Sequence, residues 1–400
     1  MSRASRKLLT ITVPAVFAAA LAVMAGIEAW VRLTLDPSRG APGFFLSDPM
    51  RGQRLAANYT GWFAGVPVHI NSLGLRDDRE YDLRKGPRTF RILILGDSVT
   101  FGHGSVNEHT YPSLLEQMLR RWRPDVDWQV WNAAVPGYNT SQELAQLLEV
   151  GPAFKPDLVV VGFFENDLMD NFTVSSPGLT ARRVSDALSF ATRHVYSLEF
   201  YKRAYLTARW KLSASDAYRQ RVEHLATEDD LLDRAGQVAN LKQQALTEYA
   251  RLTDDQVINP CPLGQKPNPA DLDALKRDPG FPAWLHAVRE LQRLHAEGAY
   301  RILFFLNVMP LVCPDGEHFY DGGVAQENEL FLHVMGEGTP AVSVYDAFLH
   351  RLPSEMPMAV AHAIGNANMT KAEVLFAYLR DRLLPSLLDP VRTAAAQAGS

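Results

Sequence analysis

Residues 91–102 contain the residue types of a nucleophilic site. An apolar run at residues 92–95 ends abruptly in Gly96-Asp97-Ser98, and a helical pattern follows a few residues later. A buried strand that stops in a tight turn places the next side chain at the carboxyl edge of a sheet, where ligands bind in open α/β folds. Ser98 is therefore a candidate nucleophile. The same serine could instead cap the following helix, because serine is a favoured N-cap residue.

Two later segments end in residues that could stabilise negative charge on an oxygen. Each follows a β-like apolar run, and they end at Gly137 and at Glu165-Asn166-Asp167. Gly137 could present a backbone N–H with no side chain in the way, and Asn166 could present its amide. With the Ser98 N–H they would form an oxyanion hole, in which each donor is typically worth ~10²–10³ in rate. Taken singly, Pro-Gly and Asn-Asp are more often turns.

In this order the three segments resemble the first three sequence blocks of the SGNH hydrolases, the GDSL-like esterases and acyltransferases. The resemblance runs from about residue 89 to about residue 384, and residues 61–77 are similar to the lead-in of membrane-anchored bacterial members. It implies a three-layer α/β/α fold with a mainly parallel, flavodoxin-like sheet. It also implies acyl transfer through Ser98, an oxyanion hole of Ser98, Gly137 and Asn166, and no metal or organic cofactor.

The general base is the point at which the chain departs from this family, which carries Asp-x-x-His just before its last helix. We expect that helix to begin near Met369 and to end near residue 384. Anchored on it, Asn366 stands at the histidine position and Ala363 at the aspartate position. A neutral amide cannot accept the serine proton at neutral pH. His362 lies four residues before Asn366, but the position for its acid is occupied by Ala359.

Three interpretations of the base stay open. His362 could reach Ser98 by a different loop path, with Glu355 or Asp346 to orient it. The base could be absent, in which case the chain would be a catalytically inactive protein that binds glycans or a partner. Another histidine could serve, and His103 and His109 are nearest to Ser98 in sequence, although we expect both to be exposed loop residues.

The spacing of apolar runs predicts the elements that position these residues. Strands are expected before each of the three segments and at about 300–308 and 341–345, and a helix is expected at 284–298, just before the strand at 300–308. Such alternation indicates a mainly parallel sheet covered on both faces. We therefore expect an α/β domain over residues 89–390, with a helical cap insertion at about 171–282. A lead-in segment at 36–88 precedes it and a flexible tail at 391–400 follows.

The N-terminus predicts the compartment. Residues 8–27 carry no charge and follow Arg3, Arg6 and Lys7. About twenty apolar residues are enough to span a bilayer, and the positive-inside rule keeps the basic end in the cytoplasm. We expect residues 1–35 to be an uncleaved anchor in the cytoplasmic membrane, with the rest on the outer, periplasmic or extracellular side. A cleaved signal peptide is the rival interpretation.

Composition and cysteine content agree with an exported protein. The net charge of −5 over 400 residues gives no reason to expect nucleic-acid binding. The two cysteines, Cys261 and Cys313, lie in similar turn-rich contexts, and an oxidising compartment would permit a disulfide between them. The alternative is two free thiols. The sequence thus predicts an exported, membrane-tethered serine esterase or O-acyltransferase that acts on acylated glycans or lipids.

Overall fold

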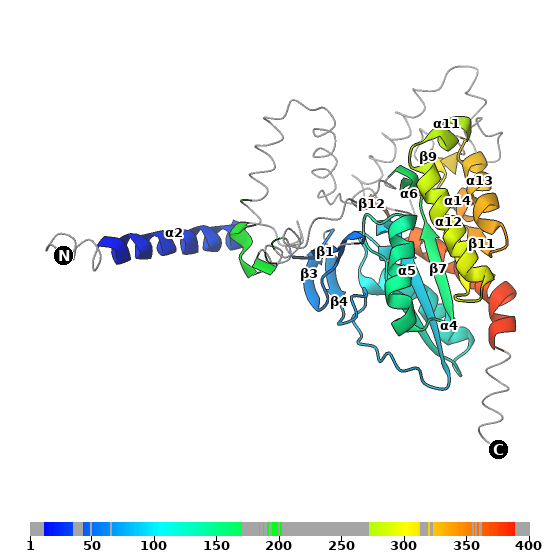
Figure 1. Cartoon of the computed structure of the whole chain (residues 1–400), viewed down its shortest axis with the longest axis horizontal. Coiled ribbons are helices and arrows are strands. Elements are labelled where there is room, and N and C mark those ends of the chain that lie inside the picture. The colour runs from blue at the N-terminus through cyan, green and yellow to red at the C-terminus, as the bar shows by residue number, and fades with distance from the viewer. Residues whose placement is uncertain are drawn as a thin grey trace.

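A five-stranded parallel sheet forms the centre of the computed structural model (Figure 1). The structure describes residues 12–34, 43–48, 50–64, 66–169, 272–312, 319–320, 323–353, 356, 358–359 and 362–388, together with separate positions between 184 and 201. The strands are β5 (Thr89–Gly96), β6 (Asp127–Asn132), β7 (Leu158–Phe163), β8 (Ile302–Leu306) and β11 (Ala341–Ser343).

The strand order is β11-β8-β7-β5-β6, and every pair is parallel. The first strand of the sheet, β5, therefore lies between the second and the third, β6 and β7. This is the flavodoxin-like order, so the α/β class and the parallel sheet expected from the sequence are confirmed. Such a sheet has a topological switch point beside its first strand, where the connections leave to opposite sides and a crevice opens at the carboxyl edge. The chain places Ser98 and Asn166 directly after the two strands that flank this point.

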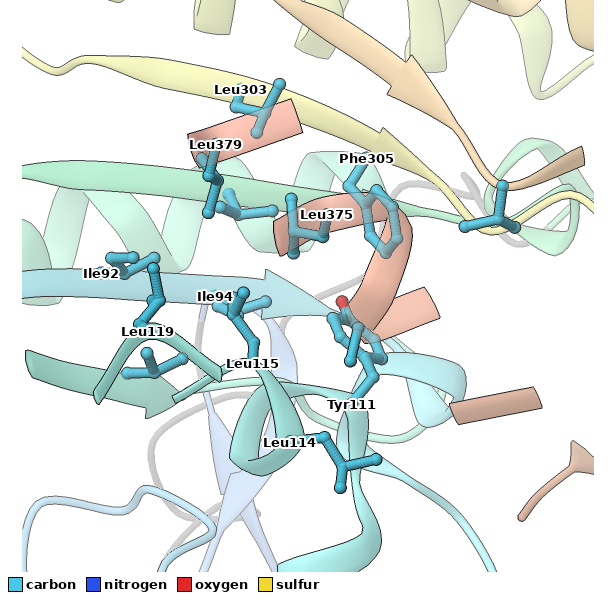
Figure 2. Close-up of a cluster of buried hydrophobic side chains, with 14 of the residues drawn as sticks. Ile92, Ile94, Tyr111, Leu114, Leu115, Leu119, Leu303, Phe305, Leu375 and Leu379 are labelled. Atoms are coloured by element: carbon cyan, nitrogen blue, oxygen red, sulfur yellow. The ribbon is translucent and has the colours of Figure 1, made fainter. Parts of the chain in front are cut away.

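Helices cover both faces of the sheet because its strands are apolar on both sides. The strand β7 is buried along its whole length, and so is β8. One face packs against the long helices α4 (Tyr111–Trp122) and α15 (Asn366–Tyr378), and Figure 2 shows Leu115 and Leu375 meeting Ile94 and Phe305 there. The other face packs against α5 (Thr140–Phe154), α12 (Phe281–Ala296) and α13 (Val324–Gly336).

Shorter elements link these layers. They are α3 (Ser98–Phe101), a 3-10 turn at Asn107–His109, α6 (Asn166–Met169), α11 (Leu272–Arg277), α14 (Tyr345–Leu349), the antiparallel pair β9 (Leu311–Val312) and β10 (Phe319–Tyr320), the antiparallel pair β12 (Met358–Ala359) and β13 (His362–Ala363), and a π-turn at Leu379–Leu383 that continues α15.

The lead-in segment folds into two hairpins that lie against the site end of the domain. They are β1 (Phe45–Asp48) with β2 (Gly52–Leu55), and β3 (Tyr59–Phe63) with β4 (Val66–Ile70). Their apolar side chains form a separate core with Phe101 and Tyr138, which follow β5 and β6. The lead-in is therefore packed on the loops that carry the candidate site.

One helix among the described residues, at Val13–Leu33, is long and apolar enough to cross a membrane, although a signal sequence near an N-terminus passes the same test. This helix, α2 (Val13–Thr34), is exposed along most of its length (Figure 1). The helix continues past the apolar run of residues 8–27. Its last turns contain Glu28 and Arg32, which form an i,i+4 ion pair that stabilises the helix.

Three sequence predictions concern the insertion, the cysteine pair and the start of the last helix. Most of the insertion expected at 171–282, and both Cys261 and Cys313, lie outside the described residues. The start of the last helix was predicted wrongly, because α15 begins at Asn366 and not near Met369. The reason is local: Gly365 turns the chain with φ 61°, and the Thr370 hydroxyl bonds the Asn366 carbonyl at 2.9 Å within the first helical turn.

Candidate active site

The turn after β5 presents Ser98 at the start of α3. Asp97 caps this short helix, and its Oδ1 accepts the Val99 N–H at 2.9 Å. Gly96 has φ 156°, and a Cβ there would overlap the Thr100 side chain. A Cβ on Gly162, its neighbour in β7, would meet the same threonine. The two glycines thus make room for Thr100, which lets the nucleophile turn lie directly on the strands.

His362 faces Ser98 across the carboxyl edge of the sheet. Its Nε2 lies 2.7 Å from Ser98 Oγ, although 264 residues separate the two in sequence. The histidine stands on β13 of the short β12–β13 hairpin and is half-buried, while Ser98 is 9% exposed. The loop path that the sequence left open therefore runs through this hairpin.

The two asparagines that follow His362 at the start of the last helix have different surroundings. Asn366 has an exposed side chain at the start of α15. Asn368 is buried and donates to Ser105 Oγ at 2.9 Å and to the His109 carbonyl at 3.0 Å. These bonds tie the start of the last helix to the loop that follows the nucleophile turn, and so fix the segment that carries His362.

Two groups expected to stabilise an oxyanion lie at the same sheet edge as Ser98. Asn166 begins α6, and its Nδ2 donates to Asp97 Oδ2 at 3.2 Å, which leaves that nitrogen a second hydrogen. Gly137 follows β6 with φ 79° and is exposed. Its loop is held by the lead-in, because Gln53 Nε2 donates to the Pro136 carbonyl at 2.9 Å.

Three titratable side chains close to one another near the nucleophile turn are buried. Asp97 is fully buried, and burial raises its pKa to about 6, against the lowering effect of bonds from Val99 and Asn166. Burial lowers the pKa of Lys371 to about 8, while the nearby Asp97 charge opposes that shift. Burial also raises the pKa of Glu143 well above its usual range. Both Glu143 side-chain oxygens have no hydrogen-bond partner among the described residues, which fits a neutral carboxyl.

His103 is stacked on His362. The two ring centroids lie 4.3 Å apart with an angle of 10° between the rings, and Phe63 meets the His103 ring edge-on at 4.8 Å. His103 is 8% exposed, so the expectation of an exposed loop histidine was wrong for it, whereas His109 is exposed. Burial lowers the pKa of His103 well below its usual range, and positive charge on His362 and Arg76 acts in the same direction.

Arg76 holds the loop that carries His103. Its guanidinium is fully buried and donates to the carbonyls of Phe101 at 2.7 Å and of Gly102 at 2.8 Å, and also to that of Ser105. It lies over the Phe101 ring at 4.3 Å. Sequence reasoning assigned no role to Arg76, Glu143 or Lys371, because charged residues carry no signal of burial without their tertiary neighbours.

Asp346 and Glu355 are the two sequence candidates for orienting His362. Asp346 is exposed on α14, and Glu355 lies outside the described residues. Within the described ranges no group of three or more His, Cys, Asp or Glu could hold a metal ion. The chemistry of the assembled groups is therefore that of a hydroxyl, an imidazole and hydrogen-bond donors at one sheet edge.

Comparison with known proteins finds a family model that matches part of the chain and a curated protein that is similar over a shorter stretch. Residues 94–266 match the model of the GDSL-like Lipase/Acylhydrolase family. An arylesterase from Vibrio mimicus is 34% identical over 82 residues, which make up 20% of this chain and 40% of that protein. The chain thus spans about two fifths of the length of this curated relative.

Two solved structures are similar over most of their own length. An alpha/beta hydrolase enzyme from the metagenome of Lake Arreo, Spain, is 15% identical with a TM-score of 0.36, and the match covers 72% of this chain and 94% of that one. A variant of an acetyl xylan esterase from Geobacillus stearothermophilus is 12% identical with a TM-score of 0.36, covering 73% and 93%. Likenesses this distant identify no substrate.

Proposed function

We propose that the chain is a serine esterase or O-acyltransferase that forms an acyl-enzyme at Ser98, and the match of residues 94–266 to the GDSL-like Lipase/Acylhydrolase family supports this proposal. The observation that carries the proposal is the 2.7 Å separation of His362 Nε2 and Ser98 Oγ. A nucleophile and a base within hydrogen-bond reach are the signature of an activated serine. The non-catalytic alternative would need a serine without a base, and this geometry does not favour it.

In the proposed reaction His362 transfers one proton in each half of the cycle. Neutral His362 Nε2 accepts the Ser98 hydroxyl proton as Oγ attacks the ester carbonyl carbon. The resulting imidazolium gives that proton to the leaving alkoxide when the ester C–O bond breaks, which leaves Ser98 acylated. Water or a second hydroxyl then gives its proton to His362 and attacks the acyl-serine. His362 passes this proton to Ser98 Oγ as the bond between Oγ and the acyl carbon breaks, which restores the free enzyme. Hydrolysis and transfer differ only in which hydroxyl attacks.

Donors around the turn would stabilise the tetrahedral intermediate. We assign this role to the Ser98 N–H, the Gly137 N–H and the second hydrogen on Asn166 Nδ2. The bond from Asn166 to Asp97 fixes the amide before substrate arrives, so the donor costs no reorganisation during the reaction. Asp97, held under the turn, thus acts through Asn166 and does not touch the substrate.

We propose further that α2 anchors the chain in the cytoplasmic membrane and that the α/β domain lies on its outer side. Support comes from the length and apolar surface of Val13–Leu33 and from the basic residues before it. An exported, tethered esterase meets acyl esters of envelope glycans and lipids, so these are the proposed substrates.

The test is hydrolysis of p-nitrophenyl acetate by the full-length protein in detergent or nanodiscs. Removing a general base typically costs ~10²–10⁴-fold, so His362→Ala should lower kcat by that factor. Ser98→Ala should leave no burst of p-nitrophenol and no labelling by a fluorophosphonate. His109→Ala is the matched control, because this histidine is exposed and should retain wild-type rates.

Asn366→His separates two interpretations, in which His362 is the general base or the base at position 366 has been lost. Since Asn366 is exposed, the added histidine should not raise activity. If the wild type is silent and Asn366→His becomes active, the base has been lost and the assignment of His362 is wrong. Equal rates for wild type and Ser98→Ala would exclude Ser98 as the nucleophile.

A further inference from the structure

The end of α2 is bonded to a segment far away in sequence, residues 194–197. Glu28 accepts the backbone N–H of Tyr196 at 3.0 Å and that of Ser197 at 2.8 Å. Arg32 donates to the His194 carbonyl at 2.7 Å and lies over the Tyr196 ring at 4.5 Å. Because Arg32 also pairs with Glu28, the last turns of α2 and this segment form one cluster. Figure 1 shows the segment beside the end of α2.

Large apolar side chains around this cluster point outward. Val184 is 55% exposed, Phe190 66%, Val195 39% and Tyr201 50%. Single exposed apolar residues are ordinary on a protein surface. Here four lie within one short stretch of chain, at the point where an exposed apolar helix ends. The edge-on contact of the Phe190 ring with His194 still leaves most of the phenylalanine uncovered.

Basic residues flank this stretch: residues 184–201 themselves contain one Arg against one Asp and one Glu, and the other basic residues lie just before and after them in sequence. Residues 181–211 contain seven Arg and Lys but two Asp and Glu, whereas the whole chain has a net charge of −5. Aromatic and aliphatic side chains combined with an excess of Lys and Arg are typical of segments that lie in the headgroup region of a membrane. Basic residues close to an anionic membrane surface gain ~1 kcal/mol each.

We propose that the exposed side chains of Val184, Phe190, Val195 and Tyr201 lie on the outer surface of an anionic membrane, beside the point where α2 leaves it. This inference rests on the proposed membrane anchor. The Glu28 and Arg32 bonds hold the segment at the level of the helix end, where Phe190 and Tyr201 can enter the headgroup region. The chain then has a second contact with the bilayer beside the end of α2.

The test places an environment-sensitive fluorescent amino acid, by codon suppression, at one of three exposed positions in the full-length protein. The positions are Phe190, Phe17 within α2, and Leu148 on α5 as the matched exposed control. The protein is reconstituted in phosphatidylcholine vesicles with and without phosphatidylglycerol, and brominated lipids serve as the quencher. We expect loss of emission at positions 17 and 190 and none at 148. Removing phosphatidylglycerol should weaken the loss at 190 alone.

Each other outcome has a defined meaning. Quenching at 17 but not at 190 leaves the anchor in place and overturns the interfacial segment. A blue shift at 190 without quenching means that protein covers the patch, from this chain or a partner, and also overturns the inference. Absence of quenching at both positions removes the anchor itself. Glu28→Ala, which deletes the two backbone bonds, should reduce quenching at 190 and leave position 17 unchanged.

Discussion

Replacing His103 by alanine would remove the ring that stacks on His362 while leaving Ser98, His362 and Asn166 in the chain. The stack has a centroid separation of 4.3 Å and an angle of 10° between the rings. Burial keeps His103 neutral, so its π face can accept a positive ring beside it. His362 becomes such a ring when it takes the serine proton. The stack should therefore hold the imidazole plane and stabilise its charged form.

The expected fall in kcat follows from the energy of the stacking contact between His103 and His362. An aromatic pair is worth ~0.5–1.5 kcal/mol beyond its buried area. If all of this is lost in the transition state, kcat falls by about 2- to 13-fold, because each 1.36 kcal/mol is a factor of ten. His103→Phe keeps a flat ring against both His362 and Phe63, so it should retain kcat to within about twofold by the same conversion.

The assay is kcat and KM for p-nitrophenyl acetate across pH, with thermal unfolding of each variant as a control for folding. A positioning role predicts that kcat falls in His103→Ala while KM is little changed. Two results would refute the reasoning. One is an unchanged kcat in a folded His103→Ala protein. The other is an equal fall in the alanine and phenylalanine variants, since stacking would then not be the relevant property.

Two further predictions concern the turn beneath the serine. Gly162→Ala would bring a Cβ against Thr100 and the Tyr111 hydroxyl, so we expect the free energy of unfolding in urea to fall by ~1–3 kcal/mol. A Gly162→Ala/Thr100→Ala double variant should recover part of this loss. The absence of recovery would argue against the overlap with Thr100. Asp97 has a raised pKa in the folded state, so its contribution to stability is present below about pH 4 and is lost as pH rises through about 6. Asp97→Asn should remove this part of the pH dependence, and denaturant midpoints of both proteins across that range would show the difference; parallel curves would contradict a raised pKa.

The positions of Ser98, Gly137 and Asn166 at a sheet edge could be predicted because the signals are local. Each residue follows an apolar run that is long enough for one strand and ends in turn residues. In a parallel sheet all carboxyl ends lie at one edge, so strand ends far apart in sequence come together by topology alone. The alternation of strands and helices predicted the layers in the same way.

The pairing of His362 with Ser98 could not be predicted from local sequence signals. The alignment to a family pattern depended on where the last helix begins, and a shift from Met369 to Asn366 changes which residue faces the serine. Helix ends are set by capping and loop contacts, here a reversal at Gly365 and the bonds of buried Asn368, which periodicity does not record.

The sequence by itself determined the sheet, its carboxyl edge and the nucleophile turn, because strand patterns and turn residues act over a few positions. Only the tertiary structure decided what surrounds that turn: His362 across 264 residues, His103 stacked behind it, Arg76 under the loop, and the buried Asp97 and Lys371. Burial and pKa depend on neighbours from distant segments. From the sequence alone, a histidine or lysine therefore resembles an ordinary surface residue, because the neighbours that bury it come from distant segments of the folded chain.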